Sequence, residues 1–126
     1  MLQREIERAL AGQAQLRDEM AKYHNRRVIA DGYGFDSQAE FARYGELVLL
    51  QQAGAISDLV VHPRYVLLDK TPTERATVYV GDFAYTEGGQ KQVVEDVKGV
   101  ETTVFRLKAA MFRRRYPGVE LRIVRA

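Results

Sequence analysis

The stretch that decides the fold is residues 77–98, which read Thr-Val-Tyr-Val-Gly-Asp-Phe-Ala-Tyr-Thr, then Glu-Gly-Gly-Gln, then Lys-Gln-Val-Val-Glu-Asp-Val-Lys. Two runs rich in β-branched and aromatic residues are separated by a glycine-containing turn, which is the pattern of a β-hairpin. We therefore predict a strand over 77–86, a turn over 87–90 and a partner strand over 91–98.

The second strand of this hairpin carries charges where a central strand would be apolar. Glu95, Asp96 and Lys98 follow directly on two valines, and Asp82 lies on the facing strand. Charges in a buried strand cost several kcal/mol unless they are paired or bound to a metal. The hairpin is therefore the first candidate for a functional site.

The turn decides which of these charges lie together, because cross-strand neighbours share one face of a sheet. A three-residue loop over 88–90 places Asp82 opposite Asp96 and on the same face as Lys98. A two-residue loop pairs Asp82 with Glu95 instead. The first register forms a cluster of two carboxylates and an ammonium that suits Mg²⁺ or Mn²⁺, and the second gives a carboxylate pair without the lysine.

Capping signals predict a helix on each side of this β-rich region. Residues 37–40 match the Ser-x-x-Glu capping box and predict a helix that runs to about residue 53, where Gly54 ends it. Thr102 or Thr103 can cap a second helix that ends near Tyr116. The apolar residues expected to face the core from this second helix are Val104, Phe105, Leu107, Met111 and Phe112.

The remaining segments predict short strands and one further helix. Asp31-Gly32 between apolar residues indicates a small hairpin, and further strands are expected at 59–61, 65–68 and 119–124. Residues 1–23 have the apolar spacing of an amphipathic helix, and residues 24–126 then form a single α/β domain.

Composition limits the class of protein. The chain has 126 residues and no cysteine, which excludes disulfides, cysteine-based zinc sites and a cysteine nucleophile. No apolar run approaches the ~20 residues that cross a bilayer, and the charged N-terminus is unlike a secretory signal, so we expect a cytoplasmic protein without a membrane partner. Any metal is expected to be a hard cation held by carboxylates.

The formal net charge of +2 hides an uneven distribution of charge. Residues 106–126 contain seven lysines and arginines, with Glu120 as their acidic residue. A basic segment on an otherwise balanced chain indicates a local anion-binding surface. The alternative is a set of solvated arginines at the end of a helix, and charge alone does not separate the two.

These residues, in this order, resemble a known family. Gly81-Asp82 followed by Asp96-Val97-Lys98 resembles the Asp…(Asp/Glu)-x-Lys signature of the PD-(D/E)XK nuclease superfamily, with glycine where its name has proline. The ordered motifs around it resemble a family of small phage and prophage nucleases, similar to Holliday junction resolvases. Those motifs are residues 35–40, 43–47, 54–56, 62–63, 81–83 and 94–99, with Thr102 and Lys108.

The resemblance covers roughly residues 24–124 and carries an expectation for the fold. It implies a restriction-endonuclease-like α/β core, in which a helix is followed by a mixed β-sheet with the active-site hairpin, a second helix and a further strand. The N-terminal helix lies outside it. One departure is His62-Pro63, which stands where the family commonly has Gln-Pro.

The resemblance also implies a role for each residue of the site. Asp82 and Asp96 would ligate Mg²⁺, for which Mn²⁺ would substitute, with help from the carbonyl of Val97. Lys98 would orient or deprotonate the attacking water and neutralise the scissile phosphate. Glu40 would match the first acidic position of the superfamily and complete the metal site, although its spacing from the predicted cap also suits the acid of a capping box.

The function implied is a Mg²⁺-dependent DNA endonuclease, most simply a Holliday junction resolvase that acts on branched or double-stranded DNA as a homodimer. Lys108 and the run Arg113-Arg114-Arg115 would grip the DNA backbone, and the N-terminal helix is the candidate dimer element. Two alternatives stay open. One is a flap, nick, single-strand or restriction-like nuclease, and the other is a non-catalytic DNA-binding module that keeps the fold.

Several polar residues near these motifs are expected to be structural. In the first of the two registers, Glu95 points away from Asp82, and Glu46 is expected on the surface or in an ion pair. His62 is expected to be a surface or loop residue. Tyr79 and Tyr85 are expected to pack in the core.

Overall fold

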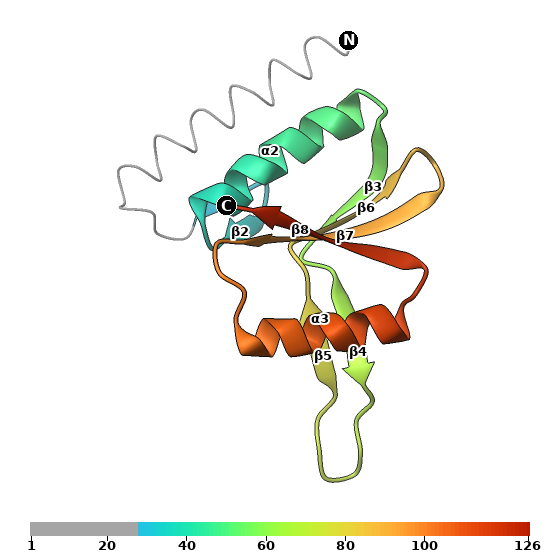
Figure 1. Ribbon diagram of the computed structural model, residues 1–126. Coiled ribbons are helices and arrows are strands. Elements are labelled where there is room, and N and C mark those ends of the chain that lie inside the picture. Colours follow the sequence, from blue (N-terminus) through green and yellow to red (C-terminus); the bar gives the residue numbers. More distant parts are fainter. Residues whose placement is uncertain (1–27) are drawn as a thin grey trace.

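The computed structural model describes residues 28–126, which form a four-stranded mixed sheet with one helix on each face (Figure 1). The predicted N-terminal helix over 1–23 lies outside the described residues. The elements in chain order are β1 (Val28–Ala30), β2 (Tyr33–Phe35), α2 (Gln38–Gln52), β3 (Ile56–Val61), β4 (Arg64–Leu68), β5 (Thr77–Val80), β6 (Phe83–Glu87), β7 (Lys91–Lys98), α3 (Thr103–Arg115) and β8 (Val119–Arg125).

The strand order in the main sheet is β3-β6-β7-β8. The pairs β3–β6 and β6–β7 are antiparallel, whereas β7 and β8 are parallel and are joined through α3. The inner strands are therefore β6 and β7, so the charged residues of β7 lie at the centre of the sheet. The predicted α/β class is confirmed, and among the described helices none is long and apolar enough to cross a membrane.

The β6–β7 hairpin has the first of the two predicted registers. Phe83 lies opposite Glu95, and the loop consists of the three residues 88–90. The same register continued by one residue places Asp82 opposite Asp96. Both glycines of the loop have positive φ (60° and 76°), a conformation that glycine adopts without steric cost.

The predicted strand over 77–86 is wrong in one respect, because it breaks at Gly81 and Asp82 into β5 and β6. The chain also breaks between β3 and β4, at His62 and Pro63, and the two breaks are hydrogen-bonded to each other. The N–H of His62 donates to the carbonyl of Asp82 at 2.9 Å, and the N–H of Gly81 donates to the carbonyl of Pro63 at 3.0 Å. The hairpin of β4 and β5 thereby leaves the main sheet (Figure 1).

Gly81 occupies the tightest point of this bend. A Cβ atom there would lie 2.8 Å from Cγ1 of Val94 on the neighbouring strand, closer than side chains pack. Glycine therefore lets the bent chain approach β7 directly.

Both predicted helix starts are confirmed. The Oγ of Ser37 accepts a hydrogen bond from the N–H of Glu40 at 3.1 Å, and the Oγ1 of Thr102 accepts one from the N–H of Phe105 at 3.1 Å. Gly54, with φ of 83°, follows the end of α2 as predicted. The small hairpin at Asp31-Gly32 is confirmed as well, since β1 and β2 pair across it.

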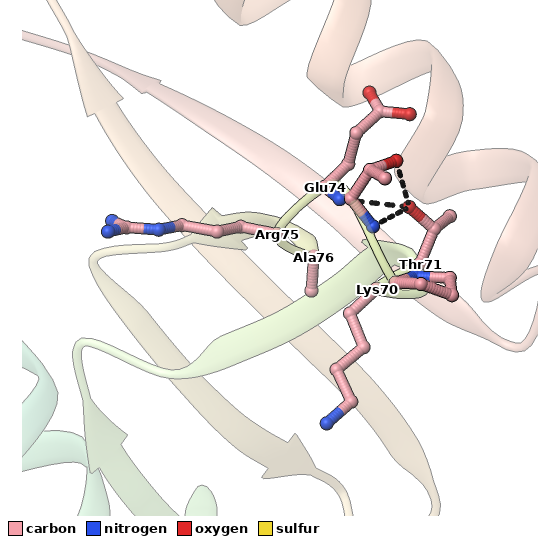
Figure 2. A pocket seen from close by; sticks show the side chains of 7 residues that line it. Lys70, Thr71, Glu74, Arg75 and Ala76 are labelled. Carbon is pink, nitrogen blue, oxygen red and sulfur yellow. Dashed lines mark hydrogen bonds between the residues drawn. The ribbon is translucent and has the colours of Figure 1, made fainter.

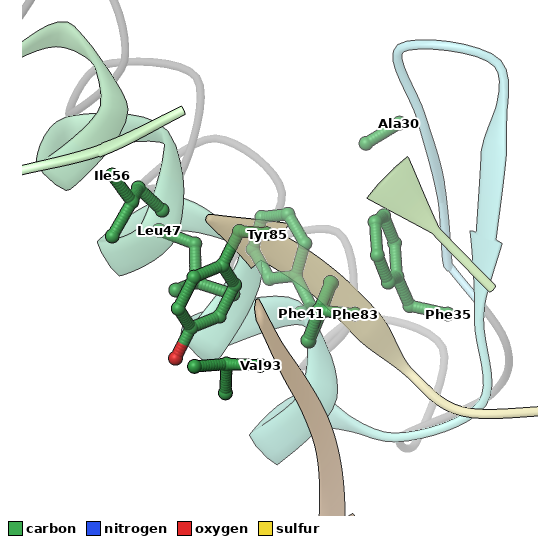
Figure 3. Packing of buried hydrophobic residues seen from close by; sticks show 8 residues of the cluster. All are labelled: Ala30, Phe35, Phe41, Leu47, Ile56, Phe83, Tyr85 and Val93. Carbon is green, nitrogen blue, oxygen red and sulfur yellow. The ribbon is translucent and has the colours of Figure 1, made fainter. Parts of the chain in front are cut away.

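The sheet separates two hydrophobic cores. The core on the α2 face is drawn in Figure 3 and consists of Ala30, Phe35, Phe41, Leu47, Ile56, Phe83, Tyr85 and Val93. The core on the α3 face consists of Leu67, Tyr79, Val94, Phe105, Ala109 and Phe112. Successive residues of β7 therefore enter different cores, as the alternation of a strand requires.

The predicted inner face of α3 is wrong at two positions. Val104 and Leu107 are 64% and 62% exposed, whereas Phe105, Ala109 and Phe112 are buried. The buried stripe follows the helical spacing of four and three residues, and the two exposed side chains lie off that stripe.

The β4–β5 hairpin is attached to α3 and ends in a polar loop. Arg115 donates to the carbonyl of Leu67 at 3.1 Å, and the hydroxyl of Tyr116 donates to the carbonyl of Val66 at 2.8 Å. At the tip, the Oγ1 of Thr71 accepts hydrogen bonds from the next residues of the loop (Figure 2). Residues 70–76 surround an open hollow of about 420 Å³ there.

Candidate active site

Asp82 lies at the bend between β5 and β6, where main-chain contacts fix its position. Its N–H donates to the carbonyl of Glu95 at 2.9 Å, and its own carbonyl accepts from the N–H of His62 at 2.9 Å. Its side-chain Oδ2 accepts a hydrogen bond from the N–H of Val97 at 2.6 Å. The bend therefore points one carboxylate along the β7 strand with little freedom to move.

The surroundings of Asp82 disfavour the charged form of its carboxylate. Burial raises the pKa of Asp82 to about 7, and the charges of Glu40 and Asp96 add to that rise, while the N–H of Val97 and the charge of Lys98 oppose it. Like charges in a buried site disfavour ionisation unless a cation lies close by. Burial and the charges of Glu40 and Asp96 thus disfavour the ionised form of Asp82, and Lys98 offsets them only in part.

Asp96 is 3% exposed and only partly satisfied. The hydroxyl of Tyr79 donates to its Oδ2 at 2.5 Å. The ammonium of Lys98 lies 3.0 Å from its Oδ1 as an ion pair, yet that oxygen accepts no aligned hydrogen bond from any described residue. A buried carboxylate oxygen with free lone pairs can bind a cation.

The hydrogen bond from Tyr79 to Asp96 is not foreseen by the strand pattern, which predicts a residue that packs in the core. Tyr79 packs in the core on the α3 face, whereas Tyr85, six residues later, packs on the α2 face. The break at Gly81 and Asp82 reverses the alternation of the chain, so the strand period cannot be continued through it.

Glu40 lies in the first turn of α2 with its carboxylate buried. Its Oε1 is 2.8 Å from Nε2 of His62, and its Oε2 accepts a long hydrogen bond from the N–H of Asp36 at 3.4 Å. The Ser37 half of the predicted capping box forms, but the Glu40 carboxylate faces His62. Position and burial thus favour a site role for Glu40 over the capping role alone.

Glu40, His62 and Asp82 form a compact ligand set. One side-chain ligand atom from each lies within 4.8 Å of those of the other two. His62 is a loop residue between β3 and β4, as predicted, but the proximity of its ring to two carboxylates was not predicted. The signal that could have found it is its place before Pro63, at the strand break that faces Asp82.

The other three predicted catalytic residues are thus arranged around Asp82. Glu40 approaches it from α2, and Asp96 and Lys98 lie on the strand that faces it. Val97 contributes its amide N–H to Asp82, whereas its predicted contribution is the carbonyl.

A pocket of about 250 Å³ opens beside Asp96 and Lys98, on the α3 side of the sheet. Lys108 lines it, with its ammonium donating to the carbonyl of Val78 at 3.0 Å. Lys98 also lies over the ring of Phe105, 4.6 Å from its centre. Two lysines therefore border a space that adjoins a buried carboxylate.

The three predicted DNA-binding arginines differ in their surroundings. Arg115 is bound to the β4–β5 hairpin through Leu67 and Asp69, and Arg114 donates to the carbonyl of Ala110 one turn earlier. Arg113 is exposed on the surface of α3. Part of the basic run therefore holds the fold together.

The opposite face of β7 carries a closed ion pair. Glu95 is fully buried and accepts two hydrogen bonds from Arg43, at 2.8 and 2.7 Å, and a short one from the hydroxyl of Tyr85. Arg43 also pairs with Glu46 at 2.7 Å. Burial, followed by the bond to Glu95, raises the pKa of Tyr85 to about 12. The predictions that Glu95 points away from Asp82 and that Glu46 forms an ion pair are confirmed.

Fold and site together define a mixed α/β protein with a buried group of acids, a histidine and a lysine at a paired strand break. The chain belongs to the family described as "Protein of unknown function (DUF1064)", whose sequence model matches residues 20–126. No curated protein and no solved structure gives a significant match.

Proposed function

We propose that the protein is a divalent-metal-dependent DNA endonuclease of the PD-(D/E)XK type. The observation that carries this proposal is the convergence of Glu40, Asp82, Asp96 and Lys98 at the bend before β6. Each of these residues matches a position of the superfamily signature. The register of the hairpin brings Asp96 and Lys98 to the strand that faces Asp82, and Glu40 approaches from α2.

The order of the elements supports the same assignment. A helix, three strands of one sheet, a second helix and a final parallel strand appear as α2, β3, β6, β7, α3 and β8. This is the order expected of a restriction-endonuclease-like core, and the β4–β5 hairpin is then an insertion between the first two strands.

The donor set fits a divalent cation. Asp82 and Asp96 offer carboxylate oxygens, and Oδ1 of Asp96 accepts no aligned hydrogen bond from a described residue. Burial, together with the charges of Glu40 and Asp96, raises the pKa of Asp82, and a bound cation would oppose that rise. Mg²⁺ and Mn²⁺ both accept such ligands. When bound there, a cation of this kind supplies an activated water and stabilises the charge that develops on the phosphate.

The residues then divide the work of hydrolysis. A water oxygen attacks phosphorus, the bond from phosphorus to the 3′ oxygen breaks, and a proton reaches that oxygen, which leaves a 3′-hydroxyl and a 5′-phosphate. The ammonium of Lys98 orients the water and offsets phosphate charge, because it lies between Asp96 and the adjacent pocket. Asp82, held by the N–H of Val97, keeps its carboxylate in place.

For the substrate we propose branched DNA, cut as by a Holliday junction resolvase. The small core suits recognition of DNA shape over base sequence, and paired cuts in opposite strands call for a homodimer. Lys108 beside the site and Arg113 on the surface of α3 are the residues that would contact phosphates.

The test is cleavage of four-way junctions, flaps, nicked duplex, linear duplex and single strands with and without Mg²⁺. We expect paired, symmetric cuts in the junction that require the metal, and a loss of at least about a hundredfold in rate for Asp82→Asn and Lys98→Met. Glu74→Gln, at the tip of the β4–β5 hairpin, is the matched control that keeps full activity.

The outcomes separate the alternatives. Cleavage confined to flaps, nicks, single strands or linear duplex would replace the resolvase with another nuclease. DNA binding without cleavage of any substrate, in Mg²⁺ or Mn²⁺, would overturn the enzymatic proposal.

A further inference from the structure

His62 is the polar residue of the site to which the resemblance assigns no role. Its Nε2 lies 2.8 Å from Oε1 of Glu40, and one ligand atom from each of these two residues lies within 4.8 Å of a carboxylate oxygen of Asp82. Neighbouring ligand atoms on a cation with bonds of ~2.1 Å and right-angled geometry lie about 3 Å apart. The spacing between His62 and Glu40 is therefore close to that of two ligands on one ion.

The main chain directs the imidazole into this position. His62 has a φ of 56°, and its N–H is hydrogen-bonded to the carbonyl of Asp82. Its ring packs near Phe35, with ring centres 6.2 Å apart. The His62 side chain is 32% exposed, against 6% for that of Glu40, so the ring forms the solvent side of the cluster.

We propose that His62 is a metal ligand together with Glu40 and Asp82, and that its nitrogen makes the site select Mn²⁺ over Mg²⁺. Mg²⁺ favours oxygen ligands alone, whereas imidazole suits transition metals. This inference rests on the metal site of the proposed function, and it adds a ligand and a metal preference to it.

The competing explanation is a simple ion pair between His62 and Glu40. Such a pair would hold the β3–β4 break against α2 without any metal. The two explanations predict different metal selectivity. If His62 only pairs with Glu40, its replacement leaves the ratio of the Mn²⁺ and Mg²⁺ affinities unchanged.

The experiment measures metal binding by the full chain in the absence of DNA. Calorimetry gives the affinities for Mn²⁺ and Mg²⁺, and pulsed electron paramagnetic resonance detects a nitrogen bound to Mn²⁺. The test variant is His62→Asn, because asparagine tolerates the left-handed backbone of this position. The matched control is His24→Asn, which changes the other histidine of the chain.

We expect tighter binding of Mn²⁺ than of Mg²⁺, and a nitrogen signal that His24→Asn keeps and His62→Asn loses. His62→Asn should weaken Mn²⁺ binding by roughly tenfold or more and Mg²⁺ binding by less, on the scale seen when a metal-ligand set is disturbed. A circular dichroism spectrum of the metal-free variants confirms that both fold.

The inference is overturned if wild-type protein gives no nitrogen signal, or if His62→Asn leaves the ratio of the two affinities unchanged. Its failure is distinct from failure of the proposed function. Selective Mn²⁺ binding without DNA cleavage would contradict the proposed nuclease activity and support His62 as a ligand. DNA cleavage with an unchanged affinity ratio would support the nuclease activity and contradict the role of His62.

Discussion

Glu95 and Asp96 are adjacent in β7, both are buried, and they lie in opposite environments. Glu95 accepts hydrogen bonds from Arg43 and Tyr85 that occupy both of its oxygens. Asp96 accepts one from Tyr79, and its second oxygen faces Lys98 without an aligned hydrogen bond. Glu95 thus lies on a closed side of the strand, where the protein supplies donors to both of its oxygens. Asp96 lies on an open side, where one oxygen can still bind a cation.

The difference shows what separates a structural charge from a candidate functional one in the same strand. Burial costs free energy for both carboxylates, so burial alone does not mark a site. A functional site is marked instead by the number and alignment of the hydrogen-bond donors around each oxygen. A protein that needs a charge only for its fold can satisfy every lone pair.

The largest effect that we predict is on stability, and it comes from removing the partner of Glu95 on the closed side. Arg43→Met removes the cation from Glu95 and leaves a fully buried carboxylate unpaired, which should lower the free energy of unfolding by about 3–5 kcal/mol. Urea denaturation measures this loss. The double variant Arg43→Met with Glu95→Gln should recover part of it, and a loss below about 1 kcal/mol in the single variant would contradict the assignment of this pair as structural.

The corresponding change on the open side should act on metal binding. We expect Asp96→Asn to change the metal-free free energy of unfolding by less than about 1.5 kcal/mol, because it replaces a poorly satisfied carboxylate with an isosteric amide. Wild-type protein should gain about 2.7 kcal/mol at a metal concentration one hundred times the Kd, and the variant should gain far less. Thermal melting with and without Mn²⁺ measures both the metal-free stability and the gain on adding metal. An equal gain in the two proteins would show that Asp96 is not a metal ligand.

The smallest effect concerns the hydroxyl of Tyr85 on the closed side. Tyr85→Phe should lower the free energy of unfolding by about 1 kcal/mol at neutral pH. Folding raises the pKa of Tyr85 from its ordinary value of 10 to about 12, so the neutral phenol contributes stability that is complete below pH 10. That contribution is lost as the pH rises from 10 to 12, and the difference between wild type and variant should shrink across this window. A difference that stays constant from pH 8 to 12 would contradict it.

Local signals in the sequence were enough to predict much of the fold. The caps at Ser37 and Thr102 depend on one side chain and a neighbouring amide, and the hairpin register depends on the loop over 88–90. Each is a short-range property, so no knowledge of the rest of the chain is needed.

Apart from Val104 and Leu107 on α3, the errors arose where distant segments act together. The bend at Gly81 exists because the chain breaks at Pro63 as well, and neither break alone predicts that they bond to each other. That pairing reverses the alternation that placed Tyr79, and it brings His62 beside Glu40. The geometry of the predicted acids followed from local register, whereas the side chains that surround them depended on this long-range contact.

The β4–β5 hairpin leaves the main sheet from the same bend that holds two residues of the ligand set. Its base is fixed by the hydrogen bonds between the two strand breaks and by Arg115 and Tyr116, while its tip over 69–76 makes a turn of its own. Doubling the length of a flexible loop costs only about 0.6 kcal/mol. The tip can thus lengthen or shorten at little cost to the stability of the bend that holds Asp82 and His62.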